Sequence, residues 1–396
     1  MTDDAEGTVT FRLAAPDPEF LHKLSLPWGA PVPAGSPRPS FPGRNIPGTG
    51  AYMIESYKPD RRIDLIRNPH FEEWSADAQP VGYPDSIVWR FGLSPARQTS
   101  AVQQGDADVM LDDPPPERLH EIVTRFPTQA HPYVETGVQY MFLNTRIPPF
   151  DSPRARRAIN LALDRAAIVK AWGGRQLAQP TCQVLSPGLP GYRPYCPYTK
   201  NATTSGTWSG PAVGRARELV RASGTTGQEV TVYAIKADPM QFSAARRVAV
   251  TLKQLGYRVR VKAIGDFNKY YSLVGKGATH AQIGNQGWTA DYSIASNFFP
   301  LLLSCDSYQP RAEFNLNAAG FCDRRIDNFS DRATAAQASA PSTAAQLWQR
   351  VDRGVVDAAP WLPLINKRGI DLLSERVGNY QRNLQLGVLL GQLWVE

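Results

Sequence analysis

The chain has 396 residues, a formal net charge of +7, 42% hydrophobic residues and 20% charged residues. At about 150 residues per domain this length predicts two or three domains, and the apolar content suffices for large cores, which excludes a wholly disordered chain. Basic residues never form a run of five or six, so nucleic acid is not the expected partner. No apolar stretch approaches the roughly 18 residues that span a bilayer.

Residues 1–10 are acidic and polar. They have neither the basic n-region nor the apolar h-region of a secretory signal. The sequence therefore predicts either a protein that stays in the cytoplasm or an internal piece of a longer chain.

Short apolar runs predict strands in the first third of the chain, separated by helices and loops. The predicted strands are 8–13, 50–57, 62–67, 86–91 and 108–111. The predicted helices are 16–26, 94–104 and 117–126. Gly105 follows the second helix as a C-cap, and the Pro/Gly/Ser-rich stretch 27–47 predicts an irregular loop.

The rest of the chain alternates helices and strands, which predicts an α/β second lobe. The predicted strands are 139–144, 229–235, 257–264, 281–284 and 361–366. The predicted helices are 151–169, 213–222, 240–255 and 346–358. The strongest helical pattern is the apolar stripe along 151–169, and the residues GNQGWTADYS at 284–293 are predicted to form a loop.

The four cysteines form two local pairs. Cys182 and Cys196 bracket a loop rich in proline, glycine and tyrosine, while Cys305 and Cys322 bracket a polar loop. Neither pair has the CxxC spacing of a zinc or redox site, so we expect two disulfides, each stabilising by about 3 kcal/mol through loop closure. Disulfides indicate an oxidising compartment, which conflicts with the missing secretory signal. A truncated secreted protein resolves this conflict. Four reduced, buried cysteines in a cytoplasmic protein are the alternative.

Sequence motifs for catalysis or cofactor binding are missing. There is no Walker sequence, strand-placed GxGxxG, GxSxG elbow or HExxH, and the five histidines are scattered. The acidic pair Asp112 and Asp113 and the basic cluster Arg154, Arg156 and Arg157 are predicted to be solvated. The sequence therefore favours a binding protein over an enzyme, with no metal and no cofactor.

Five motifs occur in an order that resembles one known family. They are GTGAYMIESYKPDRRIDLIRNPHF, RQTSAVQQGDADVM, FLNTRIPPFDSPRARRAINLALDRAAIV, GWTADY and PWLPLIN. Together they resemble the extracytoplasmic solute-binding proteins of ABC importers, family 5, which include oligopeptide, dipeptide and nickel binders. The resemblance covers nearly all of residues 8–396.

The resemblance implies an α/β, two-lobed periplasmic-binding-protein-like fold of class II type, whose cleft closes on a ligand. Lobe I is expected at 1–141 with a return at 366–396, and lobe II at 142–365, with the crossings near 140–144 and 363–367. Family members are longer, and the strand at 8–13 lies mid-domain in them. We therefore expect an incomplete lobe I with an exposed sheet edge and exposed apolar surface.

The resemblance also implies ligand-binding residues. Asp291, the acid of the GW-x-x-D motif, is expected to face the cleft and bind a ligand α-ammonium, and Trp288 to stack on the ligand. The other candidates lie at or beside the predicted hinge and cleft: Tyr292, Asn285, Tyr140, Phe142 and Asn144, with Asn297 and Phe298 as weaker candidates for the lobe II wall. Each also has a structural interpretation, as a turn cap, a core residue or hinge packing.

One of these candidates bears on the ligand class. Asn285 stands where some peptide binders carry a basic residue for the ligand carboxylate. Because an amide cannot neutralise a carboxylate, we do not expect tight recognition of a free peptide C-terminus.

The function implied is solute binding, most simply of a peptide, for an ABC import system. The ligand would be captured by cleft closure without catalysis and delivered to the permease subunits. The protein is expected to be a monomer that binds no nucleic acid and, in its full-length form, to be extracytoplasmic and membrane-associated, in the periplasm or at the cell surface. The alternative is a ligand-sensing domain of a larger actinobacterial-type transcription regulator. The missing secretory signal favours this alternative, whereas the two cysteine pairs favour a secreted protein.

Overall fold

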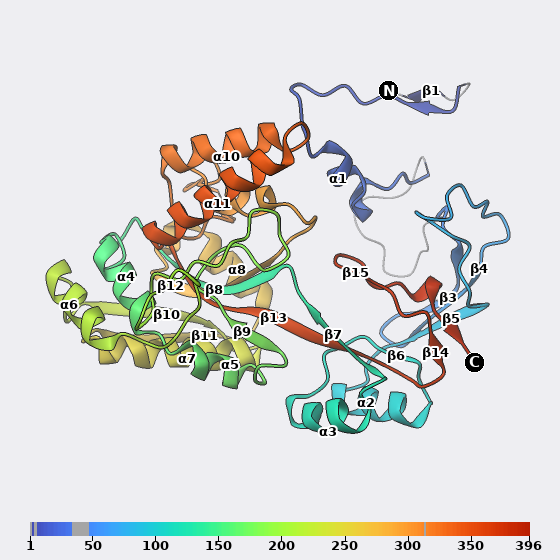
Figure 1. The fold of residues 1–396 in the computed structure, drawn as a ribbon, viewed down its shortest axis with the longest axis horizontal. Coiled ribbons are helices and arrows are strands. Elements are labelled where there is room, and N and C mark those ends of the chain that lie inside the picture. The colour runs from blue at the N-terminus through green and yellow to red at the C-terminus, as the bar shows by residue number, and fades with distance from the viewer. Residues whose placement is uncertain (1, 4–5, 34–46, 313) are drawn as a thin grey trace.

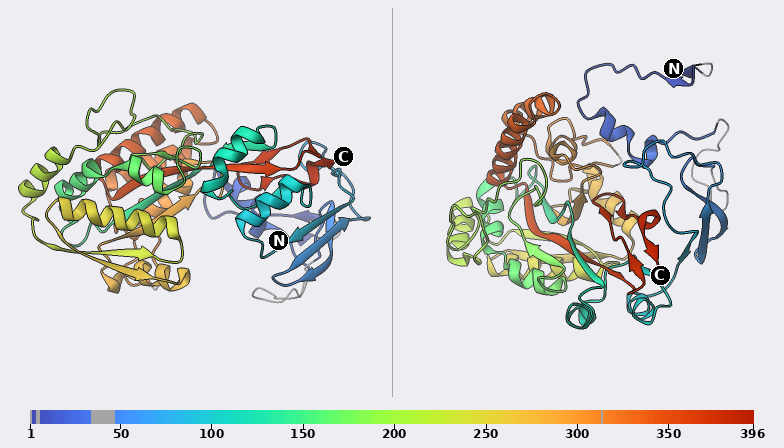
Figure 2. Two further views of the ribbon diagram at one scale, coloured as in Figure 1. Left: turned by 90° about the horizontal axis from the view of Figure 1, so that it is seen from below. Right: turned by 45° about the vertical axis from the view of Figure 1, so that its right-hand side comes forward.

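The computed structural model describes residues 2–3, 6–33, 47–312 and 314–396. The chain forms a larger and a smaller body, and strand β13 (Trp361–Leu373) runs from the first into the second (Figures 1 and 2). The larger body contains α4 to α11 and most of the central sheet. The smaller body contains β3 to β6, α2, α3 and the C-terminal hairpins.

The central sheet has eight strands, with the path β11-β10-β12-β8-β13-β6 and with β7 and β9 also paired to β13. Their bounds are β6 Val109–Met110, β7 Ala130–Val134, β8 Gly137–Leu143, β9 Ala178–Pro180, β10 Glu229–Ile235, β11 Arg258–Ile264 and β12 Ile283–Thr289. Strands β10, β11 and β12 run parallel, whereas β12, β8 and β13 alternate in direction. The first part of β13 pairs with β8 and β9, and its later part pairs with β7 and β6.

Helices cover both faces of this sheet in the larger body. Along β8, Met141 and Leu143 belong to one apolar core, and Tyr140 and Phe142 belong to the other, as the alternation of side chains along a strand requires. The helices are α4 Pro153–Ala162, α5 Arg165–Ala171, α6 Val213–Ser223, α7 Pro239–Gln254, α8 Phe267–Gly275, α9 Phe299–Leu303, α10 Arg324–Ala336 and α11 Pro341–Ala358.

The smaller body has a separate three-stranded sheet, β3-β4-β5. Its elements are β3 Tyr52–Lys58, β4 Arg62–Arg67, β5 Ser86–Arg90, α2 Pro95–Gln104 and α3 Leu119–Arg125. Two short hairpins follow β13, in which β14 (Val377–Gly378) pairs with β17 (Trp394–Val395) and β15 (Arg382–Asn383) pairs with β16 (Gly387–Val388). The N-terminal segment carries β1 Thr2–Asp3, β2 Thr8–Val9 and α1 Phe20–Leu24.

Several local predictions are confirmed. Strands β4 and β10 have the predicted bounds, and α2 ends at Gly105, whose φ of 78° is the left-handed conformation expected of a C-cap. Side chains of the β3-β4-β5 sheet are exposed, including Trp89 and Met53, and within the described part of the chain β5 pairs only with β4. The structure thus has the exposed sheet edge and apolar surface that the sequence predicts.

The prediction of one helix over 151–169 is wrong. The helix ends at Ala162, and α5 begins after Asp164, whose carboxylate accepts a hydrogen bond from the Ala167 amide at 3.1 Å. Leu163 and Asp164 are extended and this N-cap starts a new helix, so the stripe of apolar residues belongs to two helices.

Strands differ from the predictions in three places. The strand predicted at 8–13 is limited to Thr8–Val9, whereas β13 continues to Leu373 because β7 and β6 extend its pairing. Strand β12 continues to Thr289 because it pairs with β8 along its whole length, so the first half of the loop predicted at 284–293 is strand. Within the loop predicted at 27–47, Pro27–Gly29 form a 3-10 turn, and residues 34–46 lie outside the described residues.

The solvated interpretation of the basic cluster is wrong for Arg156. Its side chain is buried and donates hydrogen bonds to the carbonyl oxygens of Phe150 and Ala358, at 2.7 and 2.8 Å. Burial lowers the pKa of Arg156 to about 10. The guanidinium therefore ties α4 to the C-terminal end of α11, where carbonyl oxygens lack helical partners.

The two predicted disulfides are present: Cys182 is bonded to Cys196 and Cys305 to Cys322. Each closes a local loop of the larger body, with sequence separations of 14 and 17. Among the described residues, the helices are all too short or too polar to span a bilayer.

Candidate functional site

Asp291 lies in the loop that follows β12, with its carboxylate partly exposed. One carboxylate oxygen accepts a hydrogen bond from the Asn297 side-chain amide at 3.1 Å, and the Asp291 amide donates to the Asn297 side-chain oxygen at 3.0 Å. The described residues provide no cation for Asp291 and no donor for its second carboxylate oxygen. The carboxylate is thus held in place while one oxygen is free to accept a hydrogen bond.

Trp288 lies on β12 beside this loop and is half-buried. Its indole N–H donates to the same Asn297 oxygen at 2.9 Å, and its ring packs against the core that contains Phe298. Asn297 therefore orients both the aromatic ring and the acid, through its 3-10 turn Ala295–Asn297. The ring packs against the core but is only half-buried, which leaves surface for stacking.

Tyr292 connects the Asp291 loop to the N-terminal segment. Its hydroxyl donates to a Glu19 carboxylate oxygen at 3.2 Å, and its ring stacks on His22 with centroids 6.1 Å apart. Burial, together with the negative charge of Glu19, raises the pKa of the Tyr292 hydroxyl. These two segments are 273 residues apart in sequence, so no local pattern predicts this contact.

The side chains of the remaining candidates are already engaged in hydrogen bonds or packing within the protein. Asn285 is 2% exposed; its side chain donates to the Gln241 carbonyl at 3.1 Å and accepts from the Ile235 amide at 3.3 Å. The Tyr140 hydroxyl donates to the Gln286 side-chain oxygen at 2.7 Å, and its ring stacks on Trp361.

Two further candidates also have structural roles. Phe142 is fully buried in the core, and the Asn144 side chain donates to the Ala281 carbonyl at 3.0 Å. The structure therefore groups Trp288, near the end of β12, with Asp291 and Tyr292 in the loop that follows, and places the other candidates in packing positions around β8 and β12.

Sequence reasoning missed Gln385 and Glu19. The Gln385 side-chain amide donates to the Asp291 carbonyl at 2.7 Å from the hairpin β15–β16, although the two residues are 94 positions apart. A glutamine in a polar hairpin gives no sign of such a contact. Asp291 thus lies where the loop after β12, the C-terminal hairpin and the N-terminal segment meet.

A charged cluster on β13 and β7 adjoins this hairpin. Arg382 forms an ion pair with Asp371 at 2.6 Å and covers the Tyr133 ring, with 3.4 Å between guanidinium and ring centroid. Nearby, burial raises the pKa of Glu135, which the charge of Lys367 opposes. The cluster is internally paired, so we assign it the role of holding the hairpin that carries Gln385.

The arrangement around Asp291 can bind a cationic group but contains no nucleophile with a base. Histidine, cysteine and carboxylate side chains of the described residues do not gather into a group of three that could hold a metal. A held carboxylate beside a partly exposed indole ring is suited to an ammonium, through a charge-assisted hydrogen bond and stacking.

The fold matches that of solved periplasmic binding proteins. One is the "Clavulanic acid biosynthesis oligopeptide binding protein 2", with a TM-score of 0.84 and 22% identity over 97% of this chain and 70% of that one. Another is the periplasmic binding protein DppA from Helicobacter pylori in complex with the peptide STSA, with a TM-score of 0.72 and 19% identity over 97% of this chain and 71% of that one. The architecture thus defines the class as a periplasmic-binding-protein-like α/β protein.

The family follows from the sequence match. Residues 1–310 match the model of the bacterial extracellular solute-binding proteins, family 5, and the chain belongs to this family. Similar curated proteins include the glutathione-binding protein GsiB of Salmonella choleraesuis, 24% identical over 94% of this chain and 70% of that protein. GsiB of Escherichia coli O1:K1 is also 24% identical, over 94% of this chain and 69% of that protein. The resemblance predicted from the five motifs is confirmed.

Proposed function

We propose that this chain is the solute-binding component of an ABC importer and that its ligand carries a protonated amine, most simply that of a short peptide. Family membership supports the solute-binding role, which involves no catalytic step. The relatives are named for glutathione and oligopeptide binding, and both ligands carry a free amine. The relatives give no support to a transcription regulator.

The observation that carries the proposal is the state of Asp291. Its carboxylate is fixed by Asn297, keeps one oxygen without a described donor and has no described cation as partner. A carboxylate fixed in this way loses little conformational freedom on binding a ligand cation. Trp288 would cover the ligand beside the ammonium, and Tyr292 would hold the loop.

The two bodies would close on the ligand as lobes. We propose lobe I at 1–141 with 366–396, and lobe II at 142–365, with the chain crossing along β8 and β13. Those two strands pair antiparallel next to each other and are the connection that a hinge would use. Hydrogen bonds from Gln385 to the Asp291 carbonyl and from Tyr292 to Glu19 already join the loop that carries Asp291 to segments of the proposed lobe I.

The partners follow from this role. A monomer would carry the ligand to membrane permease subunits, without binding nucleic acid, and the full-length form would work outside the cytoplasm in association with the membrane. The two disulfides support an oxidising location.

Replacement of Asp291 with asparagine is expected to weaken binding of trialanine by about 1.5 to 3 kcal/mol, roughly 10- to 150-fold in Kd, because the ammonium loses its charged partner. Isothermal titration calorimetry with trialanine, its N-acetylated form and glutathione provides the measurement. The matched control is Asp331→Asn on the exposed face of α10, which should leave the affinity unchanged.

Two results would contradict this proposal. Equal affinity of the wild type and Asp291→Asn would remove Asp291 from the site. Binding of N-acetyltrialanine as tightly as trialanine would exclude recognition of the amine.

A further inference from the structure

Helices α4, α5, α6 and α7 pack on one face of the central sheet, because apolar residues of all four belong to the core that contains Met141 and Leu143. Among them, α6 lies at the end of the larger body farthest from the smaller body (Figure 1). The outer sides of α6 and α7 carry six exposed cations, which we call the basic face: Arg215, Arg217, Arg221, Arg246, Arg247 and Lys253. The Arg217 side chain donates to the Gln254 carbonyl at 3.1 Å and so joins the two helices.

The basic residues of the chain are concentrated in this part of the sequence. Residues 142–276 contain 21 of the 43 Lys and Arg residues but only 6 of the 36 Asp and Glu residues. Residues 1–141 have the opposite excess, with 12 Lys and Arg against 19 Asp and Glu. The formal charge of +7 therefore combines a strongly basic region with an acidic one. Such an asymmetry indicates a charged partner for the basic region.

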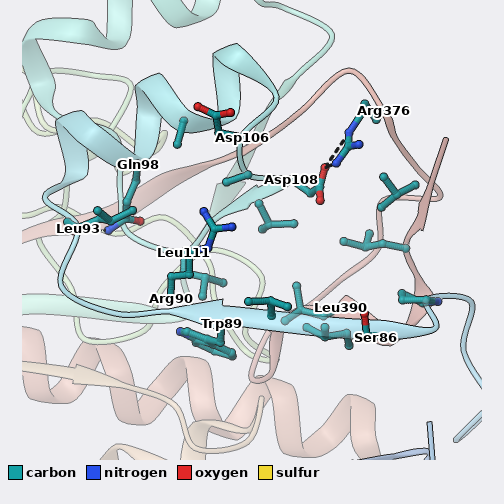
Figure 3. Close-up of a pocket in the computed structure, with 18 residues that line it drawn as sticks. Ser86, Trp89, Arg90, Leu93, Gln98, Asp106, Asp108, Leu111, Arg376 and Leu390 are labelled. Atoms are coloured by element: carbon teal, nitrogen blue, oxygen red, sulfur yellow. Dashed lines mark hydrogen bonds and ion pairs between the residues drawn. The ribbon is translucent and has the colours of Figure 1, made fainter. Parts of the chain in front are cut away.

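The cations of the basic face also lack acidic partners. Arginines of the smaller body form ion pairs, as Arg376 does with Asp108 at 2.8 Å beside a cavity of about 430 Å³ (Figure 3). By contrast, no carboxylate in the described ranges forms an ion pair with a cation of the basic face. Like charges four residues apart on a helix, such as Arg217 and Arg221, repel each other. An anionic surface would relieve this repulsion.

The chemistry of the basic face favours a lipid membrane over a nucleic acid. Val250 is 54% exposed and lies between Arg246 and Lys253 on one side of α7, as the helical spacing of these residues requires. Cations around an exposed apolar residue are typical of helices that lie on anionic lipid. Surfaces that bind single-stranded nucleic acid add aromatic rings on which bases stack. Phe242 is the one aromatic residue in the sequences of α6 and α7, and it packs against the core.

We propose that the basic face binds the anionic headgroups of a lipid bilayer and so holds the protein at the membrane with α6 and α7 towards the lipid. Each Lys or Arg near an anionic membrane surface adds to the attraction, which decays within a Debye length. The loop that carries Asp291 follows β12 and lies outside these two helices. The proposal therefore goes beyond the solute-binding role and does not depend on it.

The test is co-sedimentation of the full chain, without peptide, with vesicles of equal parts phosphatidylcholine and phosphatidylglycerol, and with vesicles of phosphatidylcholine alone. The test variant combines four substitutions whose side chains form no hydrogen bond within the described part of the chain: Arg221→Gln, Arg246→Gln, Arg247→Gln and Lys253→Gln. The matched control removes the same charge from exposed positions of α2, α3, α10 and α11: Arg97→Gln, Arg125→Gln, Arg332→Gln and Arg350→Gln.

We expect the wild type to bind the mixed vesicles, the test variant to bind them at least about tenfold more weakly, and the control to stay within about threefold of the wild type. Binding should be lost in about 1 M salt, where the Debye length is about 3 Å. Absence of wild-type binding, equal binding to phosphatidylcholine alone, or equal weakening in the control would overturn the proposal. Tighter wild-type binding to a single-stranded DNA oligonucleotide than to mixed vesicles, at equal phosphate concentration, would indicate a nucleic-acid partner and also overturn it.

Discussion

Replacement of Arg165 with methionine is expected to lower the free energy of unfolding by about 3 to 5 kcal/mol. Arg165 is fully buried at the start of α5, and no carboxylate of the described residues forms an ion pair with it. Its guanidinium donates to the carbonyls of Thr181 and Pro363, at 2.8 and 3.0 Å, and to the carbonyl and side-chain oxygens of Asn160, at 3.0 and 3.1 Å. Methionine fills similar space but leaves these acceptors buried without donors.

The position of Arg165 explains why the effect is large. It connects α4, the segment before Cys182 and strand β13, so several elements lose support together. Burial lowers the pKa of Arg165 to about 9, which reflects the cost of removing the charge from water. The carbonyl oxygens offset that cost in the native structure.

Urea unfolding of the full chain gives the measurement, with Arg154→Met as the matched control. Arg154 is exposed and donates one hydrogen bond, to the Ala222 carbonyl at 3.0 Å, so we expect its loss to cost less than about 1 kcal/mol. If both variants unfold within 1 kcal/mol of the wild type, the structural role assigned to Arg165 is wrong.

Replacement of Asp352 with alanine is expected to cost about 3 to 4 kcal/mol in unfolding free energy. The carboxylate is buried on α11 and accepts hydrogen bonds from the Gln183 side chain at 2.6 Å and the Val184 amide at 3.1 Å. Alanine leaves these donors unpaired and detaches the loop of the Cys182–Cys196 disulfide from the helix. Asp331→Ala on the exposed face of α10 is the control and should change urea unfolding little.

Asp352 also makes stability depend on pH. Burial raises its pKa to about 6 in the folded protein, against about 3.9 in the unfolded chain. Between pH 4 and 6 the native state therefore holds a proton that the unfolded state has released, so the contribution of Asp352 to stability falls as pH rises through this range and is constant above it. The shift of about two units corresponds to roughly 3 kcal/mol.

The measurement compares the unfolding free energies of wild type and Asp352→Asn between pH 4 and pH 7. The contributions of groups common to both proteins cancel in this difference. The unfolding free energy of the wild type should therefore fall relative to that of Asp352→Asn as pH increases. If this difference is independent of pH, or if the wild type becomes more stable relative to Asp352→Asn as pH increases, the raised pKa of Asp352 is wrong.

Much of the local structure was predictable because its causes are local. Period-two patterns produced the right bounds for β4 and β10, and a glycine after an apolar helix marked the end of α2. Helices α8 and α10 were not predicted, although Asp266 and Asp323 cap them by accepting hydrogen bonds from backbone amides. The aspartate that precedes each helix was the sequence signal from which the start of α8 and of α10 could have been predicted.

Burial of polar side chains was not predictable. Arg156 and Asn285 have the composition of surface or site residues, yet both are buried with backbone partners from distant segments. Their environments depend on which backbone groups the fold leaves without partners. A single sequence does not indicate which groups these are.

The sequence alone determined the family, the α/β class and the two disulfides. These follow from motif order, spacing and residue type, which are properties of contiguous stretches. Only the tertiary structure decided that Gln385 and Glu19 reach the loop that carries Asp291. Such contacts join segments far apart in the chain, and packing and backbone pairing select them when the whole chain folds.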